Sequence, residues 1–217
     1  ENVGRDLYAR VLFGAQIALK VGLIAIVVET AIGVLTDLLA SYYGDNIDKI
    51  IMLFTDITWE MPLFILATAI VTVIGPGLEK VIFAIAIASW AKFTRIVRAK
   101  TQSIKNMPYI EAARALGERH PAIMLRYILP NVLSPIIIIA TLALPTAILS
   151  ASALGFLGLG TQPPAPDWGV ILSEGVSYMN NAPWISVFPG IALALTILDC
   201  NLLGEGLRDV FDPRLKV

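Results

Sequence analysis

Residues 128–153, ILPNVLSPIIIIATLALPTAILSASA, form the stretch that decides the fold of this chain. The stretch is almost continuously apolar, and it is longer than the roughly 20 residues that an α-helix needs to cross a bilayer. Pro130, Pro135 and Pro145 interrupt it, but a membrane bundle tolerates proline because neighbouring helices satisfy the freed backbone groups. The stretch therefore predicts a membrane-spanning helix with kinks.

The composition of the whole chain agrees with this prediction. Of its 217 residues, 57% are hydrophobic and only 15% are charged, which is far from the balance of a soluble domain. A soluble bundle would carry polar faces on its helices, and long stretches of this chain have almost none. The net charge of −1 comes without a basic stripe, so the sequence excludes nucleic acid as a partner.

Four further apolar segments are expected to cross the membrane, which gives five spans. A short polar turn, Gly44-Asp45-Asn46, separates the first from the second, and Gly75-Pro76-Gly77 ends the second because this combination cannot continue a helix. The predicted spans are residues 14–43, 47–74, 78–97, 128–153 and 182–203. The sequence thus predicts an all-α polytopic membrane protein with residues 1–217 in a single transmembrane domain.

The distribution of Lys and Arg gives the orientation of these spans. Eight of the 16 cations lie between Lys92 and Arg126, whereas residues 127–207 contain none. Short loops that carry Lys and Arg stay in the cytoplasm. We therefore expect residues 98–126 to form a cytoplasmic loop and residues 154–182 an extracytoplasmic loop. The C-terminal tail, with Arg208, Arg214 and Lys216, is also expected in the cytoplasm.

A motif within the predicted cytoplasmic loop points to a known family. The segment Glu111-Ala112-Ala113-Arg114-Ala115-Leu116-Gly117 is followed by Ile128-Leu129-Pro130, and this pattern resembles the EAA loop of binding-protein-dependent ABC importer permeases. The two alanines suit a face that docks closely on a partner, and Gly117 suits a left-handed helix end before a second short helix at Pro121. The resemblance implies a coupling helix that an ATP-hydrolysing subunit grips. The residues expected to couple are Glu111, Ala112, Ala113, Arg114, Gly117, Arg119, Leu129 and Pro130.

Further matches extend the resemblance over essentially the whole chain. They are similar to the dipeptide, oligopeptide and nickel permeases, and most similar to the second of the two permeases in these systems. The matching segments are Gly4-Arg5-Asp6, Phe13-Gly14-Ala15, Tyr42-Tyr43-Gly44, Gly75-Pro76-Gly77, Phe156-Leu157-Gly158-Leu159-Gly160, Gln162-Pro163-Pro164, Asp167-Trp168-Gly169, Ala182-Pro183-Trp184 and Asn201-Leu202-Leu203-Gly204.

This resemblance implies the type I ABC importer permease fold in a prokaryotic inner membrane. It implies that the chain forms half of a translocation path for dipeptides or short peptides, with nickel or another small cation as the alternative cargo. The implied partners are a second permease subunit in a heterodimer, two ATP-binding subunits and an extracytoplasmic substrate-binding protein. Family members usually have six spans, so the first span is expected to be absent from this chain.

The sequence shows no site for chemistry of its own. There is no Gly-x-x-x-x-Gly-Lys-Ser/Thr loop, so we expect no cofactor in this chain and expect ATP and Mg²⁺ on the partner subunits. There is also no Gly-x-Ser-x-Gly or His-Glu-x-x-His motif. The single histidine, His120, lies in the cytoplasmic loop without metal-ligand spacing, which favours a surface or docking role. The chain is therefore not expected to be an enzyme.

Four carboxylates lie in or near the apolar spans: Glu29, Asp37, Asp56 and Glu60. An ionisable group there costs several kcal/mol unless it faces water or a partner, so all four are expected to face inward. Asp56 and Glu60 share one helical face, and Glu29, Asp56 and Glu60 are candidates for lining the path. The alternative is bonding within the bundle. A proton-coupled secondary transporter would also use such carboxylates, but it would not need the Glu111–Pro130 element.

Asp167 and Trp168 in the predicted extracytoplasmic loop have two interpretations. They can contact the binding protein, or Asp167 can cap a short helix while Trp168 anchors it at the membrane interface. The second interpretation is favoured because it needs no partner.

Overall fold

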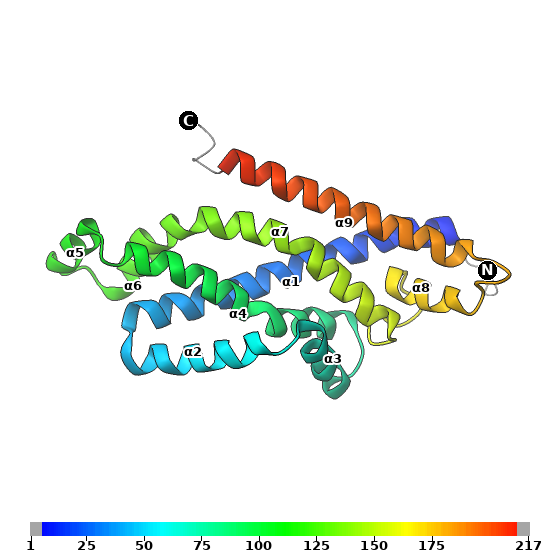
Figure 1. Cartoon of the computed structure of the whole chain (residues 1–217), viewed down its shortest axis with the longest axis horizontal. Helices are drawn as coiled ribbons and strands as arrows, with labels where there is room; N and C mark the ends of the chain where they lie inside the picture. Colours follow the sequence, from blue (N-terminus) through cyan, green and yellow to red (C-terminus); the bar gives the residue numbers. More distant parts are fainter. Residues whose placement is uncertain (1–5, 212–217) are drawn as a thin grey trace.

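The computed structural model of the chain describes residues 6–211, which form an elongated bundle of helices (Figure 1). No strand occurs in this range, and the all-α prediction is confirmed. The helices are α1 (Leu7–Tyr43), α2 (Asp45–Glu60), α3 (Leu63–Ile74), α4 (Leu78–Ile104), α5 (Pro108–Ala115), α6 (His120–Ile123), α7 (Leu129–Phe156), α8 (Trp168–Val176) and α9 (Trp184–Phe211). A π-helical turn, Met124–Ile128, joins α6 to α7. Gly4, Arg5, Arg214 and Lys216, which the sequence analysis used, lie outside the described residues.

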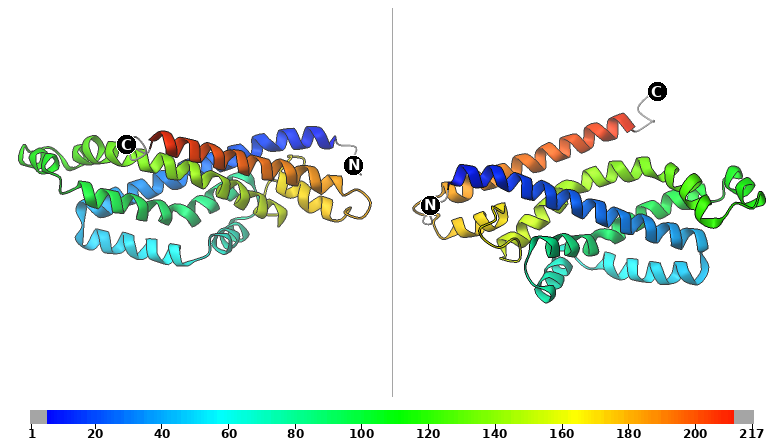
Figure 2. Two further views of the ribbon diagram at one scale, coloured as in Figure 1. Left: turned by 45° about the horizontal axis from the view of Figure 1, so that its top comes forward. Right: turned by 180° about the vertical axis from the view of Figure 1, so that it is seen from behind.

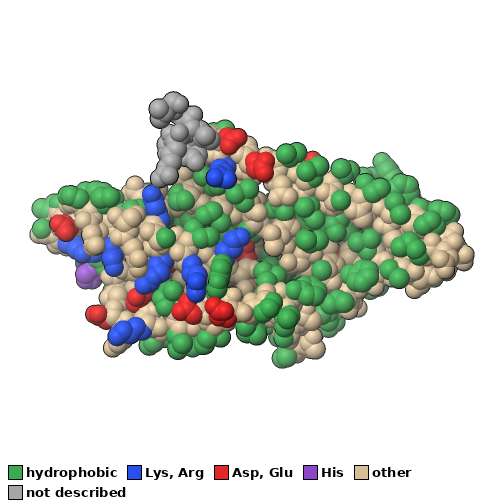
Figure 3. All heavy atoms as spheres, viewed as in Figure 1, with side chains coloured by type: hydrophobic (Ala, Val, Ile, Leu, Met, Phe, Trp, Pro, Cys, Tyr) green, Lys and Arg blue, Asp and Glu red, His purple; other side chains and the backbone are tan. Residues whose placement is uncertain are grey.

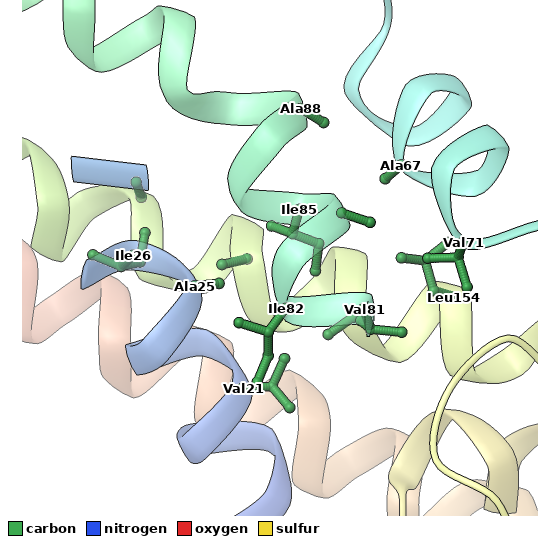
Figure 4. Packing of buried hydrophobic residues seen from close by; sticks show 14 of the residues in the cluster. Val21, Ala25, Ile26, Ala67, Val71, Val81, Ile82, Ile85, Ala88 and Leu154 are labelled. Atoms are coloured by element: carbon green, nitrogen blue, oxygen red, sulfur yellow. The ribbon is translucent and has the colours of Figure 1, made fainter. Parts of the chain in front are cut away.

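The core lies where α1, α4 and α7 pack together, with α3 closing one side. Figure 4 shows Val21 of α1 beside Ile82 of α4 and Leu154 of α7 beside Val71 of α3, and Val21, Val71 and Leu154 are each at most 2% exposed. Small residues allow close helix contact, which is a main source of helix association inside a bilayer. Gly33 of α1 shows this best, because an added Cβ would lie 2.9 Å from the backbone of α4.

The predicted second span is not one straight helix. Residues 47–74 form α2 and α3, which meet at 99° after a break at Met61 and Pro62. The cause is local, because proline disfavours the helical conformation of the residue before it, and Met61 is extended with φ −83° and ψ 128°. The expectation of an uninterrupted span was therefore wrong at Pro62.

The count of five spans is also only partly reproduced. Three stretches, 7–43, 120–156 and 184–210, are long and apolar enough to cross a membrane, or up to four if the bent pair α2–α3 counts as one span. The predicted third span lies in α4, which continues to Ile104, and no 18-residue stretch of α4 has fewer than three charged side chains. A central position explains how α4 carries this charge, because α1, α2, α3 and α7 surround it.

Ion pairs between α2 and α4 accommodate part of that charge. The Arg95 guanidinium donates to the Asp56 carboxylate at 2.6 Å. Arg98 donates through both terminal nitrogens to Asp48, with the Nη2–Oδ2 distance at 2.8 Å. Because α2 buries only Thr55, these charged contacts supplement a small apolar contact between α2 and the bundle.

The two loops predicted on opposite sides of the membrane lie at opposite ends of the bundle. Figures 1 and 2 show α5 and α6 beyond one end, and α8 near the start of α1 at the other. Figure 3 shows Lys and Arg gathered toward the α5–α6 end, while the half around α8 and the start of α9 is apolar on this face.

Asp167 caps α8 as predicted. Its carboxylate accepts hydrogen bonds from the Gly169 N–H at 2.8 Å and from the Thr161 hydroxyl at 2.8 Å. The interfacial position expected for Trp168 was wrong, because this side chain is 2% exposed and its indole N–H donates to the Val11 carbonyl at 2.9 Å. The sequence signal for this burial is Gly14 of α1, which leaves the space that the indole fills.

A second buried carboxylate, Asp37, is satisfied within the bundle. It is fully buried and accepts from the Ser41 hydroxyl of α1 at 2.6 Å and from the Thr101 hydroxyl of α4 at 2.8 Å. The alternative of bonding within the bundle therefore applies to Asp37, which links α1 to α4.

Replacement of Asp37 by alanine is expected to lower the stability of the folded chain by about 1–3 kcal/mol, because two buried hydroxyls lose their acceptor. Thr101→Val removes a single bond and should cost about 1 kcal/mol. Thermal unfolding in detergent measures both effects, with the exposed Asp209→Ala in α9 as the control. An Asp37→Ala protein as stable as the control would contradict this account.

Candidate functional site

The Glu-Ala-Ala segment lies in α5, at the end of the bundle (Figure 1). Pro108 starts the helix at a position where its missing N–H costs nothing. Gly117 follows with φ 79°. The Glu118 N–H donates to the Ala113 carbonyl at 3.1 Å, and the Gly117 N–H donates to the Arg114 carbonyl at 3.0 Å. This is the left-handed helix end that the sequence predicts.

The faces of α5 differ in exposure. Ile110 and Ala113, three residues apart, are buried in the chain's own cluster with Ile123. Ala112 is exposed, and Leu116 beyond the helix is 85% exposed. Of the two alanines expected to dock, only Ala112 is on the outer face. The spacing of Ile110 and Ala113 was the signal for the buried face, and sequence reasoning overlooked Leu116.

The charged members of the predicted coupling set surround this outer face. Glu111, Arg114 and Arg119 are all exposed, and none forms an ion pair within the described part of the chain. The Arg114 guanidinium lies 5.3 Å from the centre of the Tyr42 ring. Charges of this kind at the rim of a contact orient a partner more than they add affinity.

A contact between Tyr42 and His120 connects the loop to α1. The Tyr42 hydroxyl and His120 Nδ1 are 2.6 Å apart, and the rings meet edge to face with centres 5.3 Å apart. The last turn of α1 is thereby joined to the first residue of α6. Sequence reasoning placed His120 in the loop but did not find its partner, which is 78 residues away in the chain.

Leu129 and Pro130 lie where the loop rejoins the bundle. They open α7, and Pro130 occupies the first turn, where proline is tolerated. Leu129 is half-buried against the cluster that contains Ile110 and Ile123. These two residues therefore support the base of the loop rather than its exposed tip.

The predicted path residues do not come together. Glu29 is 2% exposed and lines a cavity of about 280 Å³ between α1, α2, α4 and α7. Asp56 and Glu60 are exposed and do not line this cavity. The expectation that all four membrane carboxylates face inward is thus wrong for Asp56 and Glu60 within this chain, because α2 lies at the edge of the bundle (Figure 2). No group of three or more His, Cys, Asp or Glu residues that could hold a metal ion occurs within residues 6–211.

The sequence of the chain is similar to those of named transport proteins over its full length. It is 44% identical to the dipeptide transport system permease protein DppC of Alkalihalophilus pseudofirmus and 46% identical to the glutathione transport system permease protein GsiD of Escherichia coli O157:H7. Each match extends over 216 residues and covers 100% of this chain and 71% of the relative.

Solved structures show the same fold. An amino acid ABC transporter matches with a TM-score of 0.68 at 20% identity, covering 96% of this chain and 95% of the other. The MetNI methionine ABC transporter in an inward-facing conformation matches with a TM-score of 0.69 at 20% identity, covering 95% of this chain and 96% of the other. The fold is therefore that of a type I ABC importer permease.

The family described as binding-protein-dependent transport system inner membrane component matches residues 29–217, a range that includes α5, Gly117 and the cavity residue Glu29. Together with the relatives, this match means that the chain belongs to this family and is a membrane-spanning permease subunit of an ABC importer, not itself an enzyme.

Proposed function

We propose that this permease forms half of a translocation path for dipeptides or other short peptides. The observation that carries the proposal is the 44–46% identity to permeases named for a dipeptide and for glutathione. Both of these cargos are short peptides with a free amino group and free carboxylates.

We propose further that the path is completed by a second, non-identical permease, with two ATP-binding subunits on the α5 side and a substrate-binding protein on the α8 side. ATP and Mg²⁺ are bound by the ATP-binding subunits in this arrangement. The gathering of Lys and Arg toward the α5–α6 end supports a cytoplasmic position for that end (Figure 3). We propose the same side for the C-terminal tail, because the described helix α9 starts near α8 and runs back toward the α5 end (Figure 1).

The outer face of α5 is the proposed docking surface for an ATP-binding subunit. The exposed Leu116 is surrounded by charged side chains, which matches the apolar centre and polar rim of protein interfaces. The Tyr42–His120 contact and the buried Ile110–Ala113 face would transmit movement of the docked subunit to α1 and α7. Glu111, Ala112, Arg114, Gly117 and Arg119 are the coupling residues in this scheme.

The test is uptake of a labelled dipeptide into liposomes that contain the complete importer and its binding protein. We expect the dipeptide-loaded binding protein to raise ATP hydrolysis and to drive uptake, and a proton gradient without ATP to drive none. Stimulation by nickel but not by dipeptide would contradict the proposed cargo.

Gly117 provides a matched pair of variants for the same assay. An added Cβ meets nothing within 4 Å, so within this chain a substitution acts through the backbone alone. Gly117→Val places a β-branched residue at φ 79°, which should cost at least about 1–2 kcal/mol in the native loop conformation, so stimulated ATP hydrolysis should fall several-fold. Gly117→Asn should retain most of the activity, because asparagine tolerates this conformation. Equal loss in both variants would point to a steric role instead.

A further inference from the structure

A cavity beside the break between α2 and α3 combines an apolar wall with several polar side chains. It has a volume of about 280 Å³ and lies where Met61 and Pro62 leave the helical path of α2. Most of its wall is apolar, which is typical of small-molecule sites. Polar groups reach it from four helices, namely Glu29 from α1, Thr58 from α2, Ser89 and Lys92 from α4, and Thr146 from α7.

The Glu29 carboxylate in this cavity lacks a full set of partners. The Ser89 hydroxyl lines the same cavity. Glu29 is only 2% exposed. Its Oε2 atom is buried and has no hydrogen-bond donor among the described residues. A buried carboxylate oxygen without a donor is costly, so a group that supplies an N–H there is bound favourably.

Lys92 determines which kind of donor fits. It lines the same cavity as Glu29 but comes from a different helix, and the two groups are not an ion pair within 4.0 Å. A bare metal ion would be repelled by Lys92 and would find no second carboxylate in the cavity. A molecule that carries both an ammonium group and a carbonyl or carboxylate oxygen satisfies both residues.

The size of the cavity restricts how much of such a molecule enters. Sites for whole drug-sized ligands span about 300–1,000 Å³, so a cavity of about 280 Å³ suits a smaller group, such as the end of a peptide. Trp59 and Pro62 give an apolar wall for the first side chain, and the Arg95 guanidinium, 5.0 Å from the centre of the Trp59 ring, holds that ring in place.

We propose that this cavity binds the amino-terminal residue of the transported peptide, with Glu29 accepting from its ammonium group and Lys92 donating to its first carbonyl oxygen. The inference rests on the peptide cargo proposed above. It assigns Glu29, Ser89 and Lys92 to a selectivity site inside the membrane, after the selection that the binding protein makes.

The experiment measures binding of a dipeptide and of its N-acetyl form to the purified complete importer without its binding protein. In the unmodified importer, acetylation should weaken binding at least tenfold, which corresponds to about 1.4 kcal/mol. Glu29→Gln should bring the two affinities within about twofold of each other, while Glu79→Gln, an exposed carboxylate in the first turn of α4, should leave the tenfold preference unchanged. Lys92→Gln provides a second variant, which should weaken both peptides and keep the preference for the free amine.

Three results would overturn the inference. The first is an unmodified importer that binds the acetylated and free peptides equally. The second is a Glu29→Gln importer that loses affinity for both peptides in parallel with its thermal stability, which is a structural effect only. The third is displacement of the dipeptide by Ni²⁺ at equimolar concentration. None of these results decides whether the importer carries peptides. That proposal is tested by the stimulation of ATP hydrolysis by the dipeptide-loaded binding protein, which does not require this cavity.

Discussion

Replacement of Leu116 by aspartate is expected to abolish stimulated ATP hydrolysis in the assembled importer. Leu116 is 85% exposed at the tip of the loop, directly before Gly117. If Leu116 is one of the few side chains that dominate this contact, its truncation costs about 2–4 kcal/mol, which corresponds to a loss of about 30-fold to 1,000-fold in binding of the ATP-binding subunit. An aspartate adds the cost of burying a charge without a partner.

The readout separates docking from folding. Co-purification of the ATP-binding subunit should fail for Leu116→Asp, while the chain and its partner permease remain assembled. Leu116→Met, which preserves volume and apolar character, should keep at least half of the stimulated activity. If Leu116→Asp still retains the ATP-binding subunit at the level of the unmodified chain, the exposed leucine is not part of the docking surface.

Gly33→Leu is expected to prevent accumulation of folded protein in the membrane. Even a Cβ at Gly33 would collide with the side chain of Phe93, and it would lie 2.9 Å from Thr94 N and Trp90 O. The backbone of α4 cannot move aside without separating α1 from the core. Overpacking of this kind costs about 1–3 kcal/mol for one methyl group, and leucine adds three further carbons.

Gly206 in α9 is the matched control for this prediction. A Cβ there meets nothing within 4 Å, so Gly206→Leu should leave the yield and the thermal stability of the detergent-solubilised chain unchanged. The yield and thermal stability of Gly33→Ala should lie between those of Gly33→Leu and Gly206→Leu. Equal stability of Gly33→Leu and Gly206→Leu would mean that α1 and α4 do not approach as closely as described.

Much of the helical architecture could be predicted from the sequence, because long apolar runs and Gly-Pro turns are local signals. The first predicted span ends at Tyr43, where α1 ends, and the third predicted span begins at Leu78, where α4 begins. The break at Met61 and Pro62 also had a local signal, but the apolar residues on both sides outweighed it. The extension of α4 to Ile104 had no such signal, because it depends on the contacts that Val97 and Ile104 make with α1 and the loop.

The candidate site was predictable only in part, for a similar reason. The helix α5 and its end at Gly117 could be predicted, because the residues that determine them lie within ten positions of each other in the sequence. The Tyr42–His120 contact joins residues far apart in the chain, and the exposure of Asp56 depends on the position of α2 at the edge of the bundle. The cavity around Glu29 is formed by residues from several helices, which no motif brings together.

The paired charges of α2 and α4 have a consequence for how the chain is made. Asp48 in the first turn and Asp56 further along leave α2 poorly suited to enter the lipid alone, since a charge adds up to about 2.5–3.5 kcal/mol to the cost of insertion by the translocon, with the highest cost at the centre of a span. Their partners Arg98 and Arg95 are synthesised about 40–50 residues later. Stable integration of α2 therefore has to await the emergence of α4 from the ribosome, so that the two helices and the bent α3 between them enter the bilayer as one unit during biogenesis.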